Sequence, residues 1–398
     1  MIPDPLLRFR DEFPILSTTT YLVSNSLGAM PRAVPARLAE YAEQWATRGV
    51  RAWAQGWWEM PITVGDEIAP LIGAGPGEVA MVPNVTIAQA QILSALEYTT
   101  GGRDTVVMTE MDFPSVRYVY DQLATRLGAR IVVVPTDDGI SVDEDRLLAA
   151  IDERTRLVAI SHVLFRSAYV LDASRICAHA HRMGALVSLD AYHSVGVLPV
   201  DVHAMQADFL TGGVLKWLCG GPGGSFLWVR PTVSEQLSPA LTGWQAHAHP
   251  FAFEPEMSYA SGAWGWLTGT PVIPALFAAV AGPQLLREAT MDAIREKSVR
   301  QTSRLIELAD SRGFLVTAPR DAARRGGTVA FDVPHAREVA QALLARDVIV
   351  DYRPGAGIRV APHFYTSDAE VESVVEIIDE ILAKDAWKKY THDTLVVT

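Results

Sequence analysis

The sequence predicts an α/β protein with a mainly parallel sheet, followed by a smaller α+β unit. Two observations lead to this prediction. Short runs rich in Val, Ile and Leu alternate with helical patterns over residues 105–229. After about Gly282 the pattern changes to long helices and a few separate strands. We therefore expect one large domain over residues 18–281 and a small domain formed by residues 1–17 and 282–398.

The predicted elements follow in sequence order. Six near-continuous apolar runs are predicted as buried strands, because such runs are typical of a sheet covered on both faces. They are residues 105–109, 130–135, 156–163, 185–190, 208–213 and 224–229. Helical patterns at 115–128 and 173–184 each end at a glycine, a common helix stop. Farther along we expect a helix over 282–313, a strand near 326–334, a helix near 337–347, strands within 348–362 and a helix over 368–387.

The composition is that of an acidic globular protein. Of 398 residues, 46 are Asp or Glu and 34 are Lys or Arg, which gives a net charge of −12. This balance argues against nucleic acid or an anionic membrane as the main partner, although a small anionic ligand needs only local positive charge. The two cysteines are too few for a disulfide framework. We see no signal peptide and no long apolar run, so we expect the cytoplasm as location.

One lysine stands in an apolar, glycine-rich stretch. Residues 208–229 read DFLTGGVLKWLCGGPGGSFLWV, and Lys216 is their single cation. In one interpretation its ammonium group simply reaches water from a buried edge. A buried lysine is rare without a chemical use, because burial disfavours the charged form and lowers the pKa. The neighbouring motifs decide between these interpretations.

Two further residues lie where a parallel sheet places its ligands, at the carboxyl ends of its strands, and a helix N-terminus is a third feature. Asp190 ends a predicted strand, and His193 follows it in DAYHSVG. Thr86 opens an apolar helix whose N-terminal N–H groups suit a phosphate. Alone, each feature has an ordinary structural explanation, such as a helix cap. Together with Lys216 they match pyridoxal phosphate, which needs a lysine for a Schiff base, a carboxylate at its pyridine nitrogen and a phosphate cradle.

Six motifs, taken in sequence order, resemble those of fold-type I pyridoxal-phosphate enzymes of the class V aminotransferase group, and within that group of kynureninase. They are DFPSVRY (112–118), RLVAISHVLFRSAYVLD (156–172), DAYHSVG (190–196), GGVLKWLCGGPGGSFLWV (212–229), TGTPVIPAL (268–276) and GIRVAPHFY (357–365). The resemblance covers nearly the whole sequence. It implies a seven-stranded sheet in the large domain, and a homodimer whose active sites are shared between subunits.

The resemblance also implies how the cofactor is held. Lys216 would form the Schiff base and then transfer the Cα proton of the substrate. Asp190 would pair with the pyridine nitrogen, with His193 beside it. Further groups would complete the cofactor site. They are Val85 and Thr86 at the phosphate, Phe113 on the ring, Ser161 nearby, and Trp244 and Thr270 at the phosphate, with Thr270 reaching across the dimer interface.

An amino acid is the substrate that the resemblance implies. Arg359 would bind its carboxylate through a bidentate pair, which the planar guanidinium group suits. The alternative for Arg359 is a surface salt bridge. Tryptophan-rich segments at 51–61 and 261–269 either pack in the core or dimer interface, or form a wall around a bulky substrate tail.

Two positions depart from the kynureninase pattern. Leu215 stands where a tyrosine is usual, whose phenol is expected to bind phosphate and assist acid–base chemistry, and Val116 replaces an aspartate. Phe364 stands where a selenocysteine-lyase-like pattern would place a cysteine, so persulfide chemistry is not expected.

We therefore expect a lyase that acts through an external aldimine and cleaves a C–S or C–C bond in the side chain of its amino-acid substrate by a β-elimination type of reaction. Such a reaction would suit the tailoring of an antibiotic or another secondary metabolite. Kynurenine hydrolysis, decarboxylation-coupled oxidative deamination and transamination stay open, as does a catalytically degenerate binding homologue. No metal site is expected.

Overall fold

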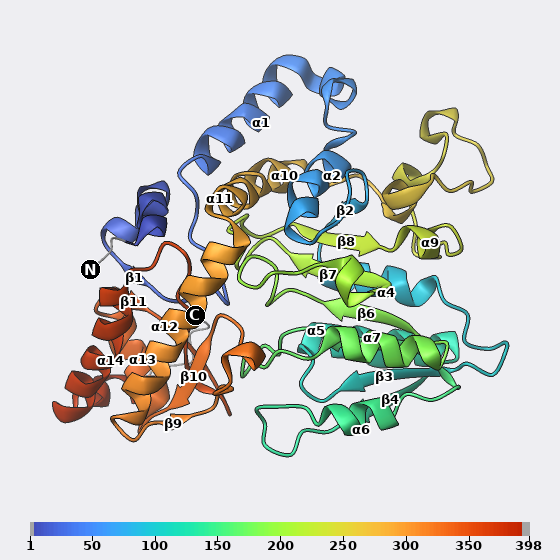
Figure 1. Cartoon of the computed structure of the whole chain (residues 1–398). Coiled ribbons are helices and arrows are strands. Elements are labelled where there is room, and N and C mark those ends of the chain that lie inside the picture. The colour runs from blue at the N-terminus through green and yellow to red at the C-terminus, as the bar shows by residue number, and fades with distance from the viewer. Residues whose placement is uncertain (1–3, 392–398) are drawn as a thin grey trace.

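A seven-stranded sheet forms the centre of the molecule in the computed structural model, which describes residues 4–391 (Figure 1). Its strands are β2 (Val79–Val82), β3 (Thr105–Thr109), β4 (Arg130–Val134), β5 (Thr155–Ser161), β6 (Leu186–Asp190), β7 (Phe209–Gly213) and β8 (Ser225–Val229). They are ordered β2-β8-β7-β6-β5-β3-β4. Strands β3 to β7 pair in parallel, whereas β8 runs antiparallel to β7 and β2. The predicted mainly parallel sheet is confirmed.

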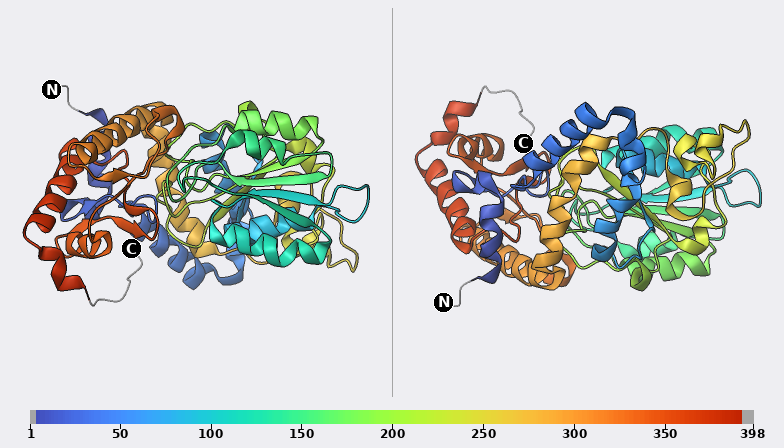
Figure 2. Two further views of the ribbon diagram at one scale, coloured as in Figure 1. Left: turned by 90° about the horizontal axis from the view of Figure 1, so that it is seen from below. Right: turned by 90° about the horizontal axis from the view of Figure 1, so that it is seen from above.

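Alternation along the strands divides the core into two layers. Val106 of β3 packs with helices α4 (Val85–Ser94) and α5 (Pro114–Leu123), whereas Val107 packs on the side of α7 (Ala173–Arg182). Successive residues of a strand point to opposite faces, so each strand contributes to both layers. Figure 2 shows helices on both sides of the sheet. This double cover explains why the central strands are mainly apolar.

Two local features differ from the sequence prediction. The sequence analysis missed β2, a four-residue strand at the sheet edge. The helix expected over 282–313 is in fact two helices, α11 (Ala281–Ala289) and α12 (Met291–Asp310). Thr290 separates them with a φ of 66°, in a region that a β-branched residue rarely adopts. This residue ends one helix and redirects the backbone into the next.

A second, antiparallel sheet lies near the carboxyl end, with its own apolar core. Its order is β12-β13-β10-β9, and helices α12, α13 and α14 pack in the same unit. The additional elements are β9 (Leu315–Val316), β10 (Val329–Asp332), β12 (Asp351–Arg353), β13 (Gly357–Val360), α13 (Ala336–Leu344) and α14 (Asp368–Ala383). Helix α14 begins with a capping box, in which the side chains of Ser367 and Glu370 each accept a hydrogen bond from the other residue's backbone N–H.

The two sheets support a division of the protein into two domains. We propose the limits that the sequence suggests, residues 18–281 for the large domain and 1–17 with 282–398 for the small one. The short strand β1 (Thr20–Tyr21) crosses this division, because it pairs in parallel with β11 (Val348–Ile349).

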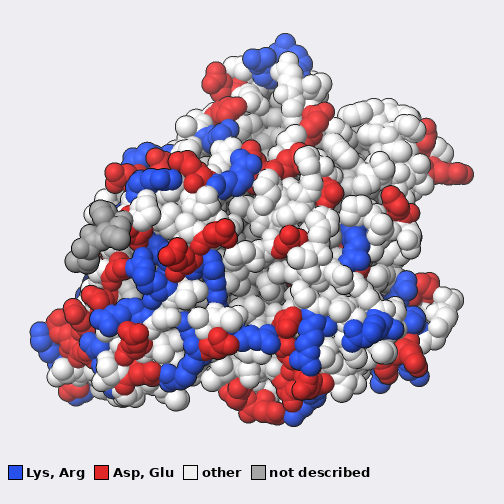
Figure 3. All heavy atoms as spheres, in the orientation of Figure 1, with Lys and Arg blue, Asp and Glu red and all other residues white. Residues whose placement is uncertain are grey.

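The remaining α-helices surround the large sheet or project from it. They are α1 (Val34–Arg48), α2 (Met60–Thr63), α3 (Gly65–Ile68), α6 (Glu144–Ala149), α8 (Val202–Met205), α9 (Pro231–Ser234) and α10 (Ile273–Ala279). Helix α1 stands out from the body in Figure 1. Figure 3 shows basic and acidic residues intermixed over the small domain on this face. Within residues 4–391, no helix has the length and apolar character needed to cross a bilayer.

Candidate active site

A cavity of about 230 Å³ opens at the carboxyl ends of the central strands. Ser161 ends β5, Asp190 ends β6, and Lys216 follows β7 by three residues. The topology therefore brings together residues that lie far apart in the sequence. Seven of the ten predicted site residues line this cavity. They are Lys216, Asp190, His193, Val85, Thr86, Phe113 and Ser161.

Lys216 is held at the cavity by a histidine and two aromatic rings. Its Nζ donates to Nε2 of His193 over 2.7 Å, and it lies 4.6 Å from the ring centre of Tyr192 and 5.4 Å from that of Phe113. Burial, helped by the charge of Arg359 and opposed by that of Asp190, lowers the pKa of Lys216 to about 7. A neutral amine is thus accessible near neutral pH, as a nucleophilic or proton-accepting lysine requires.

Asp190 is a buried carboxyl group at the end of a central strand. Its Oδ1 accepts a hydrogen bond from the backbone N–H of Tyr192 over 2.9 Å. Burial raises the pKa of Asp190 to about 6, against the effects of this hydrogen bond and of the Lys216 charge. Burial also keeps the pKa of His193 well below its usual value, so this imidazole is neutral. A cationic ligand atom beside Asp190 would replace the solvation that its carboxylate has lost.

The N-terminus of α4 forms another part of the cavity wall. Asn84 caps the helix, and its amide oxygen accepts from the backbone N–H of Ile87 over 3.0 Å. Val85 and Thr86 are the first two helical residues, and both line the cavity. Their N–H groups have no acceptor within the helix, and the helix dipole favours an anion at this end. This arrangement suits a phosphate group.

Phe113 and Ser161 are positioned by a buried carboxylate that the sequence analysis missed. Asp112 accepts from the backbone N–H groups of Thr109 over 2.8 Å and of Ser161 over 2.6 Å. It thereby ties the loop that carries Phe113 to the end of β5. The Phe113 ring meets that of Phe165 edge to face, with 5.1 Å between the ring centres.

Arg359 lies outside the residues that line the cavity, in a buried ion pair. Its guanidinium group, 3% exposed, contacts the carboxylate of Asp351, which is 0% exposed, and donates to the carbonyl oxygen of Phe165. The two residues are directly opposed on β12 and β13. Arg353 and Ser26 also contact Asp351, over 2.7 Å and 2.8 Å. The pair is therefore internal, and the alternative of a surface salt bridge is wrong.

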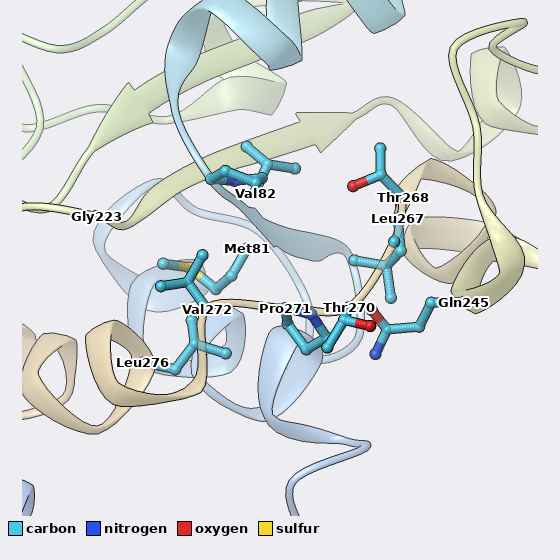
Figure 4. Close-up of a pocket in the computed structure, with 12 residues that line it drawn as sticks. Met81, Val82, Gly223, Gln245, Leu267, Thr268, Thr270, Pro271, Val272 and Leu276 are labelled. Carbon is cyan, nitrogen blue, oxygen red and sulfur yellow. The ribbon is translucent and has the colours of Figure 1, made fainter.

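Trp244 and Thr270 are not brought to the Lys216 cavity within one subunit. Thr270 lines a small separate pocket on the other side of the β2–α4 turn, where Figure 4 shows it beside Gln245. Trp244 is 41% exposed and packs against Trp58, with 4.9 Å between the ring centres.

Comparison with known proteins places this sequence in a family. The model of the family described as "Aminotransferase class-V" matches residues 20–373. The chain belongs to the class-V aminotransferase family. It is 34% identical over 396 residues to a kynureninase of Pseudomonas fluorescens, covering 96% of this chain and 94% of that protein. A kynureninase of Burkholderia pseudomallei is 33% identical, with 97% and 94% covered.

Solved structures of low sequence identity share the fold of this class-V protein. A cysteine desulfurase from Thermococcus onnurineus superposes with a TM-score of 0.84 at 22% identity, covering 96% of this chain and 99% of the other. The cystine C–S lyase C-DES, in complex with cysteine persulfide, gives a TM-score of 0.83 at 21% identity, with 92% and 99% covered.

The resemblance to pyridoxal-phosphate enzymes is thus confirmed at the level of family and fold, and the protein is a class-V enzyme of this kind. The residues at the cavity fit the cofactor. A lysine of lowered pKa faces a buried carboxyl group, and an aromatic ring and a helix N-terminus complete the wall.

The residues that distinguish this class-V enzyme from the kynureninase pattern lie in the same cavity. Leu215 and Val116 both line it. Tyr192, Phe165 and Ser225 line it too, and sequence reasoning did not single them out. Tyr192 lies in the motif DAYHSVG, two residues after Asp190, and a large aromatic residue at this position could have indicated that it belongs to the site.

Proposed function

We propose that this enzyme is a pyridoxal-phosphate-dependent lyase that cleaves a C–S bond in the side chain of an amino acid by β-elimination. The observation that supports this choice is the wall beside Lys216. Leu215 and Val116 line the cavity at the positions where the kynureninase pattern has a tyrosine and an aspartate, and neither can give or take a proton through its side chain. β-Elimination of a thiolate needs one base at the substrate Cα and no acid at the departing sulfur, which this lining allows.

Each residue then has a defined task. Bound pyridoxal phosphate supplies an electron sink for the charge that develops at the substrate Cα. Lys216, with its pKa near 7, removes the Cα proton. His193 holds the Lys216 amine in place through the 2.7 Å hydrogen bond, and Asp190 keeps a proton at the pyridine nitrogen of the cofactor. The bond to the β-substituent would then break, the departing thiolate would take a proton from solvent, and one water would hydrolyse the remaining unsaturated amine to pyruvate and ammonia.

Substrate orientation is the task that we propose for Arg359. Arg359 is a buried guanidinium group whose carboxylate partner, Asp351, also contacts Arg353. A substrate carboxylate would pair with the Arg359 guanidinium through its planar donors. Arg359 also contacts the backbone of Phe165, a residue of the cavity wall, which links the ion pair to the reaction cavity.

A kynureninase-type hydrolase is the second candidate, favoured by the kynureninase relatives at 33–34% identity. Hydrolysis of a ketone in the substrate requires an activated water and proton transfer on the departing group. Leu215 supplies neither at the position where the kynureninase pattern has a phenol.

Product analysis separates these functions. The purified protein with pyridoxal phosphate is incubated with S-aryl and S-alkyl cysteines, cystine and kynurenine. Pyruvate and ammonia from a cysteine conjugate support the proposal, whereas alanine and anthranilate from kynurenine at a comparable kcat/KM would replace it with the hydrolase. A keto acid with the cofactor left as its amine indicates transamination, and an aldehyde with oxygen consumption indicates decarboxylating deamination. A protein that binds no cofactor would be a degenerate homologue.

We further propose a homodimer in which Thr270 serves the cavity of the other subunit. Its exposure outside the Lys216 cavity of its own subunit supports this arrangement. The test is complementation between Lys216→Ala and Thr270→Ala subunits. In a mixed dimer one site then keeps both wild-type residues, so activity returns above that of either parent. No recovery would mean that Thr270 acts within its own subunit or not at all.

A further inference from the structure

Tyr192 is the one phenol among the residues that line the Lys216 cavity within the described range 4–391. It follows Asp190 by two residues, and its N–H binds the Asp190 carboxylate. The centre of its ring lies 4.6 Å from Nζ of Lys216. Tyr192 therefore contacts both Asp190 and Lys216, the two residues that we expect to hold the cofactor ring.

The hydroxyl end of Tyr192 lies over the last residue of β7. A Cβ atom on Gly213 would lie 2.1 Å from Cζ of Tyr192 and 2.2 Å from its phenolic oxygen. The φ angle of Gly213 lies outside the left-handed region, so the backbone does not require glycine there. The absence of a Cβ at Gly213 therefore leaves the space that the phenol occupies.

Strand register places this phenol near the N-terminus of α4. Gly213 pairs with Ser225 across β7 and β8, and Ser225 pairs with Val82 across β8 and β2. Val82 is two residues before Asn84, the cap of α4. Ser225 lines the same cavity as Tyr192 and lies close enough to influence the pKa of its phenol. The phenol, Ser225 and the first turn of α4 therefore meet at one end of the cavity.

We propose that the Tyr192 hydroxyl binds the phosphate of pyridoxal phosphate, in the role that the kynureninase pattern gives to a phenol at position 215. Leu215 has no polar group for this task, and Tyr192 reaches the phosphate end from the neighbouring loop. Burial and the charge of Asp190 raise the pKa of Tyr192, so the phenol stays protonated and acts as a donor. The inference rests on pyridoxal phosphate being the cofactor.

Cofactor binding by the apoprotein tests the proposal without reference to turnover. Apoprotein of wild type and of Tyr192→Phe is titrated with pyridoxal phosphate and, separately, with pyridoxal, which lacks the phosphate. Loss of a hydrogen bond to a charged group predicts that Kd for pyridoxal phosphate rises roughly ten- to hundredfold. Kd for pyridoxal should stay unchanged. Tyr98→Phe, which removes a buried phenol outside the cavity lining, serves as the matched control.

A second variant tests the geometry. Gly213→Ala places a Cβ within 2.2 Å of the phenol and must displace it, so the same phosphate-specific loss is expected. In a Tyr192→Ala background the added methyl meets no phenol, so it should cause no further loss.

Two results would overturn the proposal. One is a Tyr192→Phe protein that binds pyridoxal phosphate as tightly as the wild type. The other is an equal loss for pyridoxal and for pyridoxal phosphate, which would assign Tyr192 a packing role. A wild type that does not bind pyridoxal phosphate would instead contradict the proposed function itself.

Discussion

Replacing Asp351 by Asn should strongly destabilise the small domain, because Arg359 then becomes a buried cation without its carboxylate. The guanidinium of Arg359 is 3% exposed and the Asp351 carboxylate 0%, so water cannot take over as partner. Arg353 is 28% exposed, whereas Arg359 is almost fully buried, so most of the cost comes from Arg359. Removing one partner of a buried ion pair costs about 3–5 kcal/mol. The asparagine oxygen still accepts a hydrogen bond, which places the expected loss near the lower limit, about 3 kcal/mol.

Urea unfolding of the holoprotein, followed by tryptophan fluorescence, measures this loss. The matched control is Asp310→Asn, which removes the partner of Arg320 from an exposed pair and should leave the midpoint almost unchanged. A double variant, Asp351→Leu with Arg359→Met, should regain most of the stability, because no buried charge remains. A midpoint for Asp351→Asn within error of the wild type would show that the buried Arg359 does not depend on Asp351, and the reasoning would fail.

Lys216→Ala should bind pyridoxal phosphate without forming the visible band of the lysine-linked cofactor, which an absorbance spectrum shows directly; a persisting band would mean that another amine is used. Because burial lowers the Lys216 pKa to about 7, the neutral amine fraction rises through pH 7. Stopped-flow capture of pyridoxal phosphate by the apoprotein should accelerate up to that pH and then level off, whereas a rate still climbing toward pH 10.5 would indicate an ordinary lysine. Gly28→Ala places a Cβ 2.1 Å from the Lys216 carbonyl oxygen, and overpacking of this kind costs about 1–3 kcal/mol. Thermal unfolding should show the loss, and Gly269→Ala, with no atom within 4 Å of its new Cβ, should not.

The elements that sequence reasoning identified are those whose pattern is set by burial. Strands β3 to β8 lie within one or two residues of their predicted limits, because most of their positions are apolar, and all of these strands except the edge strand β4 are largely buried. Lys216, Asp190 and His193 were found because polar residues at strand ends interrupt that pattern. The edge strand β2 was missed because it is short and adjoins a turn at residues 83–84.

Other features depend on contacts that no local pattern encodes. The break at Thr290, with its positive φ, lies inside a continuous helical pattern, and the two helices that it separates both contribute to the large apolar core. Asp112 acts through backbone N–H groups of distant residues. The Asp351–Arg359 pair could have been found, because the turn within DYRPGAGIR sets the two residues opposite one another in a hairpin.

The close fit between Tyr192 and Gly213 restricts the order in which this site can change. A residue larger than glycine at position 213 overlaps the phenol, so it is tolerated only after Tyr192 has been replaced by a smaller residue. Conversely, loss of the Tyr192 hydroxyl is harmless only when another polar group already reaches the same end of the cavity. Few series of single substitutions therefore lead from a phenol at position 192 to a phenol at position 215. Substitutions at positions 192, 213 and 215 that are harmful one at a time can be tolerated in combination.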